Sequence, residues 1–192
     1  MKTIAKPLNY IWSKIFERRL SSTISFVTSH FDWKKRKTGE DAFMHSYRMF
    51  KNCLRSWIYD EAILKSLLLH DIIEDSELSL EEIKREFGYQ VSCIVEGMTW
   101  VNENKEKFSK SDYFFMFKMY CDYDWRILFV KLFDCIDNIE TIDWLNPEKQ
   151  DKFKTEKKEI YLPIFENFTD EIPYEIKQIY IKKVNELRKL LS

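Results

Sequence analysis

Hydrophobic residues recur at helical spacing along almost the whole chain. Near the start, Ile11, Ile15, Leu20, Ile24 and Phe26 follow this period and predict a helix over about residues 8–30. The same pattern predicts further helices over residues 41–55, 59–75, 80–87, 90–98, 111–120, 125–142, 148–162 and 173–190. The last of these is expected to pack its apolar face inward through Ile176, Ile179, Val184 and Leu187. The predicted fold class is therefore all-α.

Capping signals define some of these boundaries. Ser79 and Glu82 fit a capping box, in which the serine side chain accepts a hydrogen bond from the Glu82 amide and the glutamate reaches back. Gly88 can take the left-handed conformation that ends this helix. Asn146 followed by Pro147 fits a cap and a first helical position. The polar stretches at residues 34–40 and 102–107 are predicted to be loops.

The composition is typical of one globular domain. The 192 residues are 45% hydrophobic and 33% charged, which is enough apolar material to bury a core, so we expect a single domain over residues 1–192. Only 3 glycines and 4 prolines are present, and this scarcity of turn residues also favours helices. The formal net charge of -1 offers no basic excess to neutralise a nucleic-acid backbone, so we expect no nucleic-acid partner.

Cysteine spacing and hydropathy indicate the cellular setting. The four cysteines lie far apart without a CxxC pair, so we expect reduced and mostly buried thiols at Cys53, Cys93, Cys121 and Cys135. Charges interrupt the N-terminal stretch, and no stretch approaches 18 apolar residues. We therefore expect no signal peptide, no membrane partner and a cytoplasmic location. Nothing in the sequence specifies an oligomeric state.

The segment LLLHDIIED, residues 67–75, places several ionisable groups among apolar ones. In one continuous helix Glu74 would lie a turn after His70, and Asp75 a turn after Asp71, so that each pair shares a face. Taken singly, Asp75 could cap a helix end and Glu74 could face solvent. Together the four groups are costly to bury unless they are paired or bind a metal. A divalent cation would supply the counter-charge.

Two other segments contain compatible ligands. Asp134 lies inside an apolar run, and His45 lies on the helix predicted over residues 41–55. Taken singly, His45 could be an ordinary helix histidine and Asp134 a cap or ion-pair partner. As a set, His45, His70, Asp71 and Asp134 form a mixed nitrogen and oxygen donor group that suits manganese, iron or zinc. We therefore predict one divalent-metal site formed by these four residues.

At these positions the sequence resembles the HD superfamily, and more narrowly the (p)ppGpp hydrolase domain of the RelA/SpoT family. The segment RKTGE at residues 36–40, followed by His45, resembles the family's R-x-S-G-E-P-Y-I-x-H, and HDIIED at residues 70–75 resembles H-D-V-V-E-D. Residues 81–99 and 124–141 follow two longer patterns, one ending in G-V-T and one containing K-L-A-D-R-L-H-N-M-R-T. The resemblance is strongest over residues 25–165, and the length resembles the small, hydrolase-only members.

The resemblance implies an all-α HD-domain helical bundle whose buried manganese site removes pyrophosphate from the ribose 3′ position of the alarmones ppGpp and pppGpp. It implies that the metal is held by His45, His70, Asp71 and Asp134. Glu74 and Asp75 match the family's catalytic acidic pair. The substrate, a small-molecule nucleotide of the stringent response, would be contacted by Arg36, Lys37, Thr38, Asn138 and Thr141.

Departures from the family pattern bear on the substrate. The family's D-R-x-H-N reads D-C-I-D-N here, so that Cys135 and Asp137 replace an arginine and a histidine. Trp100 replaces the lysine after the V-T step, and Ser46 replaces the proline after the first histidine. These changes leave two alternatives open. One is an HD phosphohydrolase acting on another nucleotide, such as a 5′-nucleotidase, and the other is a non-catalytic nucleotide-binding regulator.

Overall fold

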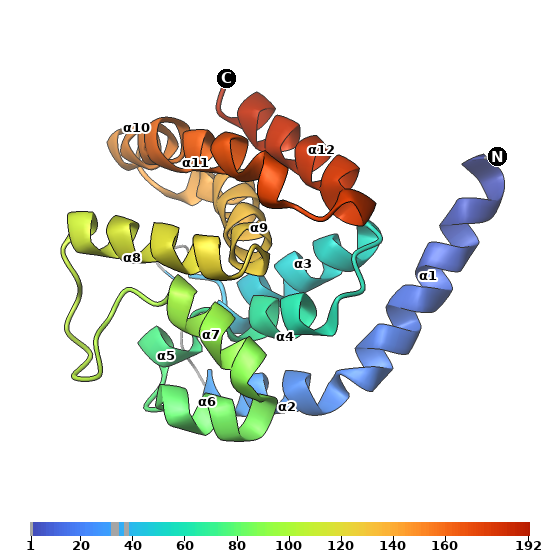
Figure 1. The fold of residues 1–192 in the computed structure, drawn as a ribbon, viewed down its shortest axis with the longest axis horizontal. Coiled ribbons are helices and arrows are strands. Elements are labelled where there is room, and N and C mark those ends of the chain that lie inside the picture. The colour runs from blue at the N-terminus through green and yellow to red at the C-terminus, as the bar shows by residue number, and fades with distance from the viewer. Residues whose placement is uncertain (1, 32–34, 37–38) are drawn as a thin grey trace.

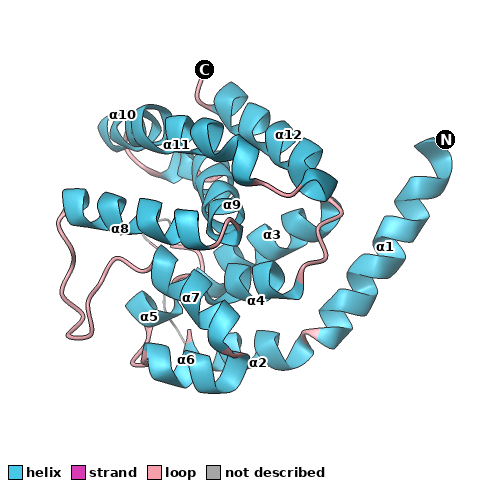
Figure 2. Cartoon of the chain, viewed as in Figure 1, coloured by secondary structure: helices cyan, strands magenta, loops and turns pink. Residues whose placement is uncertain are grey.

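The computed structural model describes residues 2–31, 35–36 and 39–192, and side chains from residue 8 onward within these ranges. Over the described residues the chain is helical without a strand, as predicted (Figures 1 and 2). The helices are α1 (Lys2–Arg19), α2 (Ser21–His30), α3 (Ala42–Arg55), α4 (Glu61–Leu69), α5 (Ile72–Asp75), α6 (Leu80–Phe87), α7 (Tyr89–Met98), α8 (Lys110–Tyr123), α9 (Arg126–Glu140), α10 (Pro147–Glu156), α11 (Leu162–Asn167) and α12 (Tyr174–Leu190). Single turns of 3-10 helix lie at Ile142–Trp144 and Phe168–Glu171, and a π-helical turn lies at Lys157–Tyr161.

Helix α9 lies at the centre of the bundle. It contacts α3, α4, α7, α8 and α12, and residues 127–137 are all buried. In Figure 1, α10 to α12 form a layer above α9, whereas α6 lies below α4 and α7. The apolar run over residues 127–130 of α9 fits this position, since a helix that is covered on every side has no face left for solvent.

A glycine allows α7 to approach its neighbours closely. A Cβ atom at Gly97 would lie 2.8 Å from Ile127 Cδ1 and 3.0 Å from Tyr120 Cβ. Both distances are shorter than ordinary van der Waals contact, so an alanine at this position would push α7 away from α8 and α9. Gly97 therefore determines how tightly these three helices pack.

Two predicted helices are interrupted. The helix predicted over residues 8–30 divides at Leu20, a buried residue outside helical geometry, because α1 packs against α3 whereas α2 packs against α4. The helix predicted over residues 59–75 divides at His70 and Asp71. Asp71 has φ -98° and ψ 0°, and its carbonyl accepts the first hydrogen bonds of α5. His70 and Asp71 therefore lie at a helix junction, not inside one helix as predicted.

Other boundaries confirm the capping signals. The Ser79 capping box is complete, and Gly88 ends α6 with a φ of +87°. The Asn146 side chain accepts the Lys149 amide at the start of α10. The helix predicted over residues 148–162 instead comprises α10, the π-helical turn and the start of α11.

Burial on α12 and at the cysteines was largely predicted. Val184 and Leu187 of α12 are buried, whereas Ile176 and Ile179 are half-buried. All four cysteines are free thiols in the core. None of the helices described is both long and apolar enough to cross a membrane.

Candidate metal centre and active site

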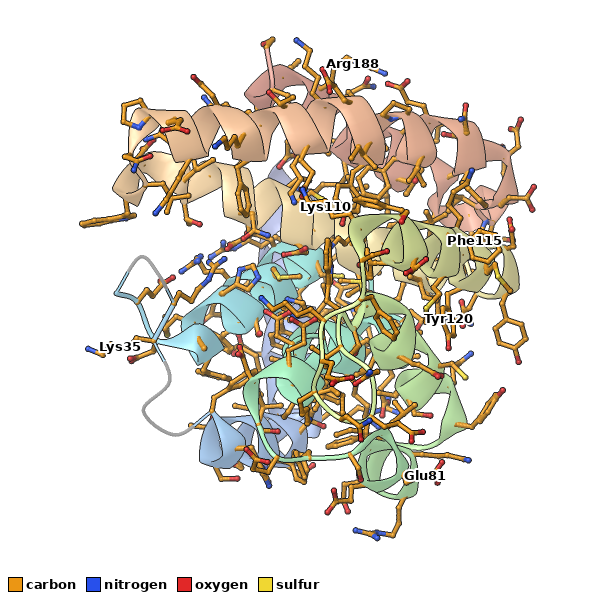
Figure 3. The ribbon with its side chains drawn as sticks, turned by 90° about the vertical axis from the view of Figure 1, so that its left-hand side faces the viewer. Lys35, Glu81, Lys110, Phe115, Tyr120 and Arg188 are labelled. Carbon is orange, nitrogen blue, oxygen red and sulfur yellow. The ribbon has the colours of Figure 1, made fainter. Side chains whose placement is uncertain are left out.

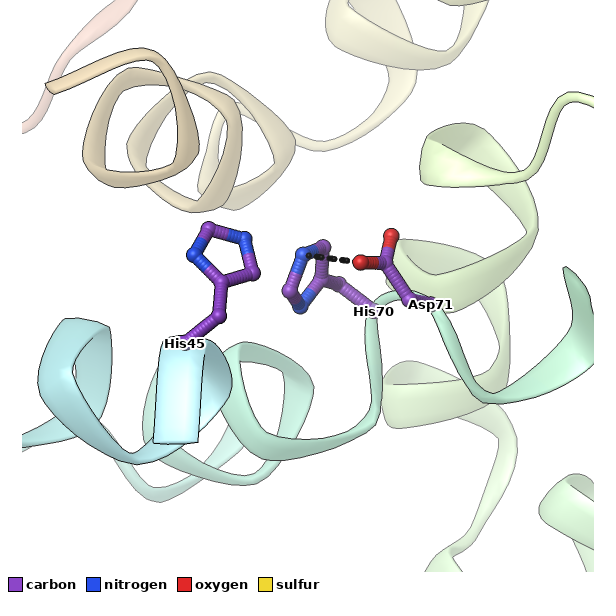
Figure 4. Close-up of side chains that lie close together, drawn as sticks. All are labelled: His45, His70 and Asp71. Carbon is purple, nitrogen blue, oxygen red and sulfur yellow. Dashed lines mark ion pairs between the residues drawn. The ribbon is translucent and has the colours of Figure 1, made fainter. Parts of the chain in front are cut away.

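Three of the four predicted metal ligands come together where α3 faces the junction between α4 and α5. His45, His70 and Asp71 each offer a ligand atom, and these atoms all lie within 4.8 Å of one another (Figure 4). His70 Nε2 lies 3.1 Å from Asp71 Oδ2, and the centroids of the two imidazole rings are 5.1 Å apart. Both histidines are buried, at 2% and 1% exposure, while the Asp71 side chain is 39% exposed. The group is thus open to solvent on the side of Asp71.

The fourth predicted ligand, Asp134, contacts this group at His45. Its Oδ1 lies 3.3 Å from His45 Nε2, and its Oδ2 lies 3.0 Å from Lys131 Nζ. Lys131 is itself buried one turn earlier on α9. Burial would raise the pKa of Asp134, but the charge of Lys131 and the contacts with His45 and His70 keep it well below its usual range. Asp134 is therefore an ionised carboxylate beside the other three groups.

The donor set fits a divalent cation. His70 Nε2 is buried without a hydrogen-bond partner and faces the Asp71 carboxylate. Burial opposes protonation of His70, yet the negative charge of Asp71 outweighs it and raises the pKa of His70 to about 9. In the metal-free protein the proton on His70 thus supplies positive charge that a cation could supply instead. The same cation would bind His70 Nε2, which otherwise lies buried without a hydrogen-bond partner.

The predicted acidic pair lies on the single turn of α5. Glu74 Oε1 accepts a hydrogen bond of 2.8 Å from the Trp100 amide, and Asp75 is the last residue of the turn. Burial, together with the negative charge of Asp71, raises the pKa of Glu74. Glu74 is thereby directed by the backbone of the loop after α7 and holds a proton more readily than an ordinary glutamate.

Lys105 fastens the loop between α7 and α8 to the same turn. Its φ is +62°, and its Nζ donates to the carbonyl oxygens of Ile73, Ser76 and Leu78 at 2.5, 3.2 and 3.1 Å. These bonds satisfy backbone acceptors at and after the end of α5, where a helix leaves its last carbonyls without partners. The loop after α7 thus holds the one-turn helix that carries Glu74 at two points, through the Trp100 amide and the Lys105 side chain.

The structure brings together some of the predicted substrate residues. Lys37 and Thr38 lie outside the described residues. Arg36 Nη2 donates to Asn138 Oδ1 at 2.5 Å, and Asn138 Nδ2 donates to Asp134 Oδ1. Thr141 Oγ1 donates to the Asp137 carbonyl at 2.8 Å, so this hydroxyl is engaged within its own helix end. Lys35 is exposed and points away from the molecule (Figure 3).

Three charged residues at the site were missed by the reasoning from sequence. Asp137 is buried against the predicted ligand His45 and Lys131 is buried against the predicted ligand Asp134, while the half-buried Arg48 binds Asp137. A signal was present, since Arg48 and Asp137 each lie three residues after a predicted ligand and so share its helix face. In the family motif, Asp137 stands out only as a replacement for histidine.

Comparisons with known proteins identify the class. The HD domain family model matches residues 24–167, and the chain belongs to this family. The chain is 34% identical over 131 residues to the guanosine-3′,5′-bis(diphosphate) 3′-pyrophosphohydrolase of Aquifex aeolicus, covering 68% of this chain and 19% of that one. It is 30% identical over 166 residues to the GTP pyrophosphokinase of Streptomyces coelicolor, covering 83% of this chain and 20% of that one. These results confirm the resemblance seen in the motifs.

A solved structure supports the fold assignment. It is described as "a metazoan ortholog of SpoT" that "hydrolyzes ppGpp and plays a role in starvation responses". It superposes with a TM-score of 0.66 at 18% identity, covering 88% of this chain and 93% of that one. At this identity the likeness shows the HD fold. The chain spans about a fifth of the length of the curated relatives it matches.

Proposed function

We propose that this chain hydrolyses the 3′-pyrophosphate of ppGpp and pppGpp in the cytoplasm, with manganese as its metal. The observation that carries the proposal is the group formed by the buried His45 and His70 and the half-buried Asp71, with Asp134 beside it, in an HD domain. Relatives named as ppGpp 3′-pyrophosphohydrolases, from Aquifex and Synechocystis, are 34% identical over this region. A mixed set of imidazole and carboxylate donors is compatible with manganese.

The four residues His45, His70, Asp71 and Asp134 would hold the cation. When bound, a divalent cation polarises a phosphoryl oxygen and lowers the pKa of water. In the proposed reaction, water attacks the phosphorus of the 3′-phosphoester, the bond between this phosphorus and O3′ breaks, and O3′ takes up a proton. The products are GDP or GTP, and pyrophosphate.

Glu74 is the residue to which we assign the proton transfer. Its pKa is raised by burial and by Asp71, which brings it closer to neutral pH, where a general acid or base works best. The hydrogen bond from the Trp100 amide leaves the other carboxylate oxygen to exchange a proton with water or with O3′. Asp75, on the same turn, is proposed as its partner.

Arg36 and Asn138 are proposed to hold the nucleotide. The Arg36 guanidinium offers a bidentate fork suited to phosphate oxygens, and its Nη1 is buried without a hydrogen-bond partner. Asn138 can bond a ribose hydroxyl. Because the two side chains bond each other in the absence of nucleotide, substrate binding would replace that bond with two others.

Product analysis tests the proposal most directly. The metal-stripped protein is reloaded with Mn²⁺, Mg²⁺, Zn²⁺ or Fe²⁺ and incubated with ppGpp, and the products are separated by anion-exchange chromatography. GDP and pyrophosphate formed fastest with Mn²⁺ is the expected result. Intact ppGpp together with cleavage of a nucleoside monophosphate would support a 5′-nucleotidase instead. Binding of ppGpp without any cleavage would support a regulator.

A substitution at Arg36 tests the proposed nucleotide contact. Arg36→Ala removes a guanidinium that binds no metal in this assignment, so the KM for ppGpp should rise by about tenfold or more, as expected for a lost charge-assisted hydrogen bond of about 1.5–3 kcal/mol. Manganese content, measured by mass spectrometry, should not change. An unaltered KM would remove Arg36 from the nucleotide site.

A further inference from the structure

Asp137 on α9 is a buried carboxylate whose charged partners come from α3 and the loop that precedes it. Its side chain is 2% exposed, and Oδ2 lies 2.6 Å from His45 Nδ1. Arg48 donates to both oxygens, from Nε to Oδ1 and from Nη2 to Oδ2, each at 2.8 Å. Arg36 Nη1 lies further off, at 3.9 Å from Oδ2. Burying a carboxylate is costly unless it is paired, and the bidentate guanidinium supplies the pairing.

The hydrogen bonds that Asp137 receives determine which nitrogen of His45 carries hydrogen. A guanidinium only donates, so both carboxylate oxygens of Asp137 accept hydrogen bonds from Arg48. Because both oxygens act as acceptors, His45 Nδ1 is the donor in its 2.6 Å contact with Oδ2. In a neutral ring the lone pair is then on Nε2, the nitrogen that faces Asp134 at 3.3 Å.

We propose that Asp137, held by Arg48, is a positioning residue that fixes the tautomer and the ring orientation of His45 so that Nε2 is presented to the metal. A carboxylate that accepts the second N–H of a metal-binding imidazole is a recurrent way of orienting such a ligand. This inference rests on the proposed metal centre and adds to it a residue outside the four ligands.

The pair also accounts for the departure from the family motif. Asp137 stands where the family pattern D-R-x-H-N has histidine. A neutral histidine carries no charge with which to pair the half-buried guanidinium of Arg48, whereas an aspartate does. Arg48 also contacts Glu40, at the end of the loop that contains Arg36. The Arg48–Asp137 pair therefore joins the metal ligand His45 to the loop proposed to bind nucleotide.

The test compares Asp137→Asn with the wild type, without nucleotide. In the metal-free wild type, ¹⁵N-detected NMR of the 3 histidines should show a protonated Nδ1 on His45, with its ring proton shifted downfield by the short hydrogen bond to a carboxylate. Asp137→Asn should lose that shift. Its affinity for Mn²⁺, measured by EPR of the free ion, should fall about 10–100-fold, as is typical for loss of such a partner.

Arg48→Met and a matched control complete the test. Arg48→Met should also weaken Mn²⁺ binding, because Asp137 would lose its guanidinium. The control is Arg126→Met, since Arg126 is similarly exposed, at 23% against 29%, and pairs with Asp60 and Asp124 instead of the site. It should leave Mn²⁺ affinity and the His45 signals unchanged, even if it lowers thermal stability.

Two outcomes would overturn the inference. One is Asp137→Asn with wild-type Mn²⁺ affinity, and the other is a wild-type His45 whose Nδ1 carries no proton. Either result, in a wild type that still binds Mn²⁺, leaves the metal centre standing and removes only the role of Asp137. A wild type that binds Mn²⁺ but spares ppGpp would refute the proposed substrate and leave this inference intact.

Discussion

Metal binding should depend steeply on pH, because His70 must release a proton before it can bind a cation. Burial opposes protonation of this ring, but the charge of Asp71 outweighs it and raises the pKa of His70 to about 9. At pH 7 the pKa of His70 lies about 2 units above the pH. Releasing the proton therefore costs about 2.7 kcal/mol, at about 1.36 kcal/mol per unit. The apparent Mn²⁺ affinity should rise about tenfold between pH 7 and pH 8, and level off above pH 9.

The same proton affects the stability of the metal-free protein. The pKa of His70 is raised in the folded state above its unfolded value of about 6.5. Its contribution to stability is thus fully present below about pH 6.5 and is lost as the pH rises through about 9. Metal-free protein should become easier to unfold over this window. Metal-loaded protein should not show this pH dependence, because the cation has already displaced the proton.

Calorimetry can measure both the Mn²⁺ affinity and the stability of the metal-free protein. Titration of Mn²⁺ at pH 7 in buffers of different ionisation enthalpy should reveal about one proton released per ion bound. His30→Gln is a matched control. Of the chain's 3 histidines, His30 is the one that lies outside the metal group, on α2. It should leave the pH slope unchanged. An affinity that stays flat between pH 7 and pH 8.5, with no proton released, would refute the assignment of His70.

Further predictions concern catalysis, charge and packing. Glu74→Gln should bind Mn²⁺ normally but release pyrophosphate about 10²–10⁴ times more slowly; wild-type turnover would remove Glu74 from catalysis. Lys131→Met should cost about 3–5 kcal/mol in urea unfolding of the metal-free protein, because it leaves Asp134 buried without its partner at 3.0 Å. Saturating Mn²⁺ should restore much of this loss, and equal losses with and without metal would contradict the charge argument. Gly97→Ala should lower stability by about 1–3 kcal/mol through overpacking, and Ile127→Val in the same chain should recover part of it by removing the atom 2.8 Å away. Thermal unfolding of the single and double variants checks this, and an undiminished melting temperature in Gly97→Ala would count against the close approach.

Local rules in the sequence were sufficient for most helices. The capping box at Ser79 and the cap at Asn146 depend on residues a few positions apart, so they can be recognised without knowledge of the fold. The breaks at Leu20 and at His70–Asp71 could not be predicted in this way. Apolar spacing continues across both of them, and the chain turns because the flanking helices pack against different partners.

The candidate site shows the same division. Charges inside apolar segments require compensation, and this rule singles out His70, Asp71 and Asp134 in the sequence. In the structure, His70 and Asp71 group with His45, and Asp134 contacts His45. The pairing of Arg48 with Asp137 joins positions 89 residues apart and has no local signature. The family motif alone shows Asp137 only as a residue that replaces a histidine near the substrate.

The separation of the site residues along the chain has a consequence for synthesis on the ribosome. His45 and its carboxylate partner Asp137 are 92 positions apart. At about 5–20 residues per second, a growing chain carries His45 for about 5–18 seconds before Asp137 is added. During that interval the imidazole has neither the carboxylate that orients it nor Asp134 beside it. A chain that stalls before α9 therefore cannot assemble this centre, and capture of the cation marks a polypeptide that has already been translated through its central helix.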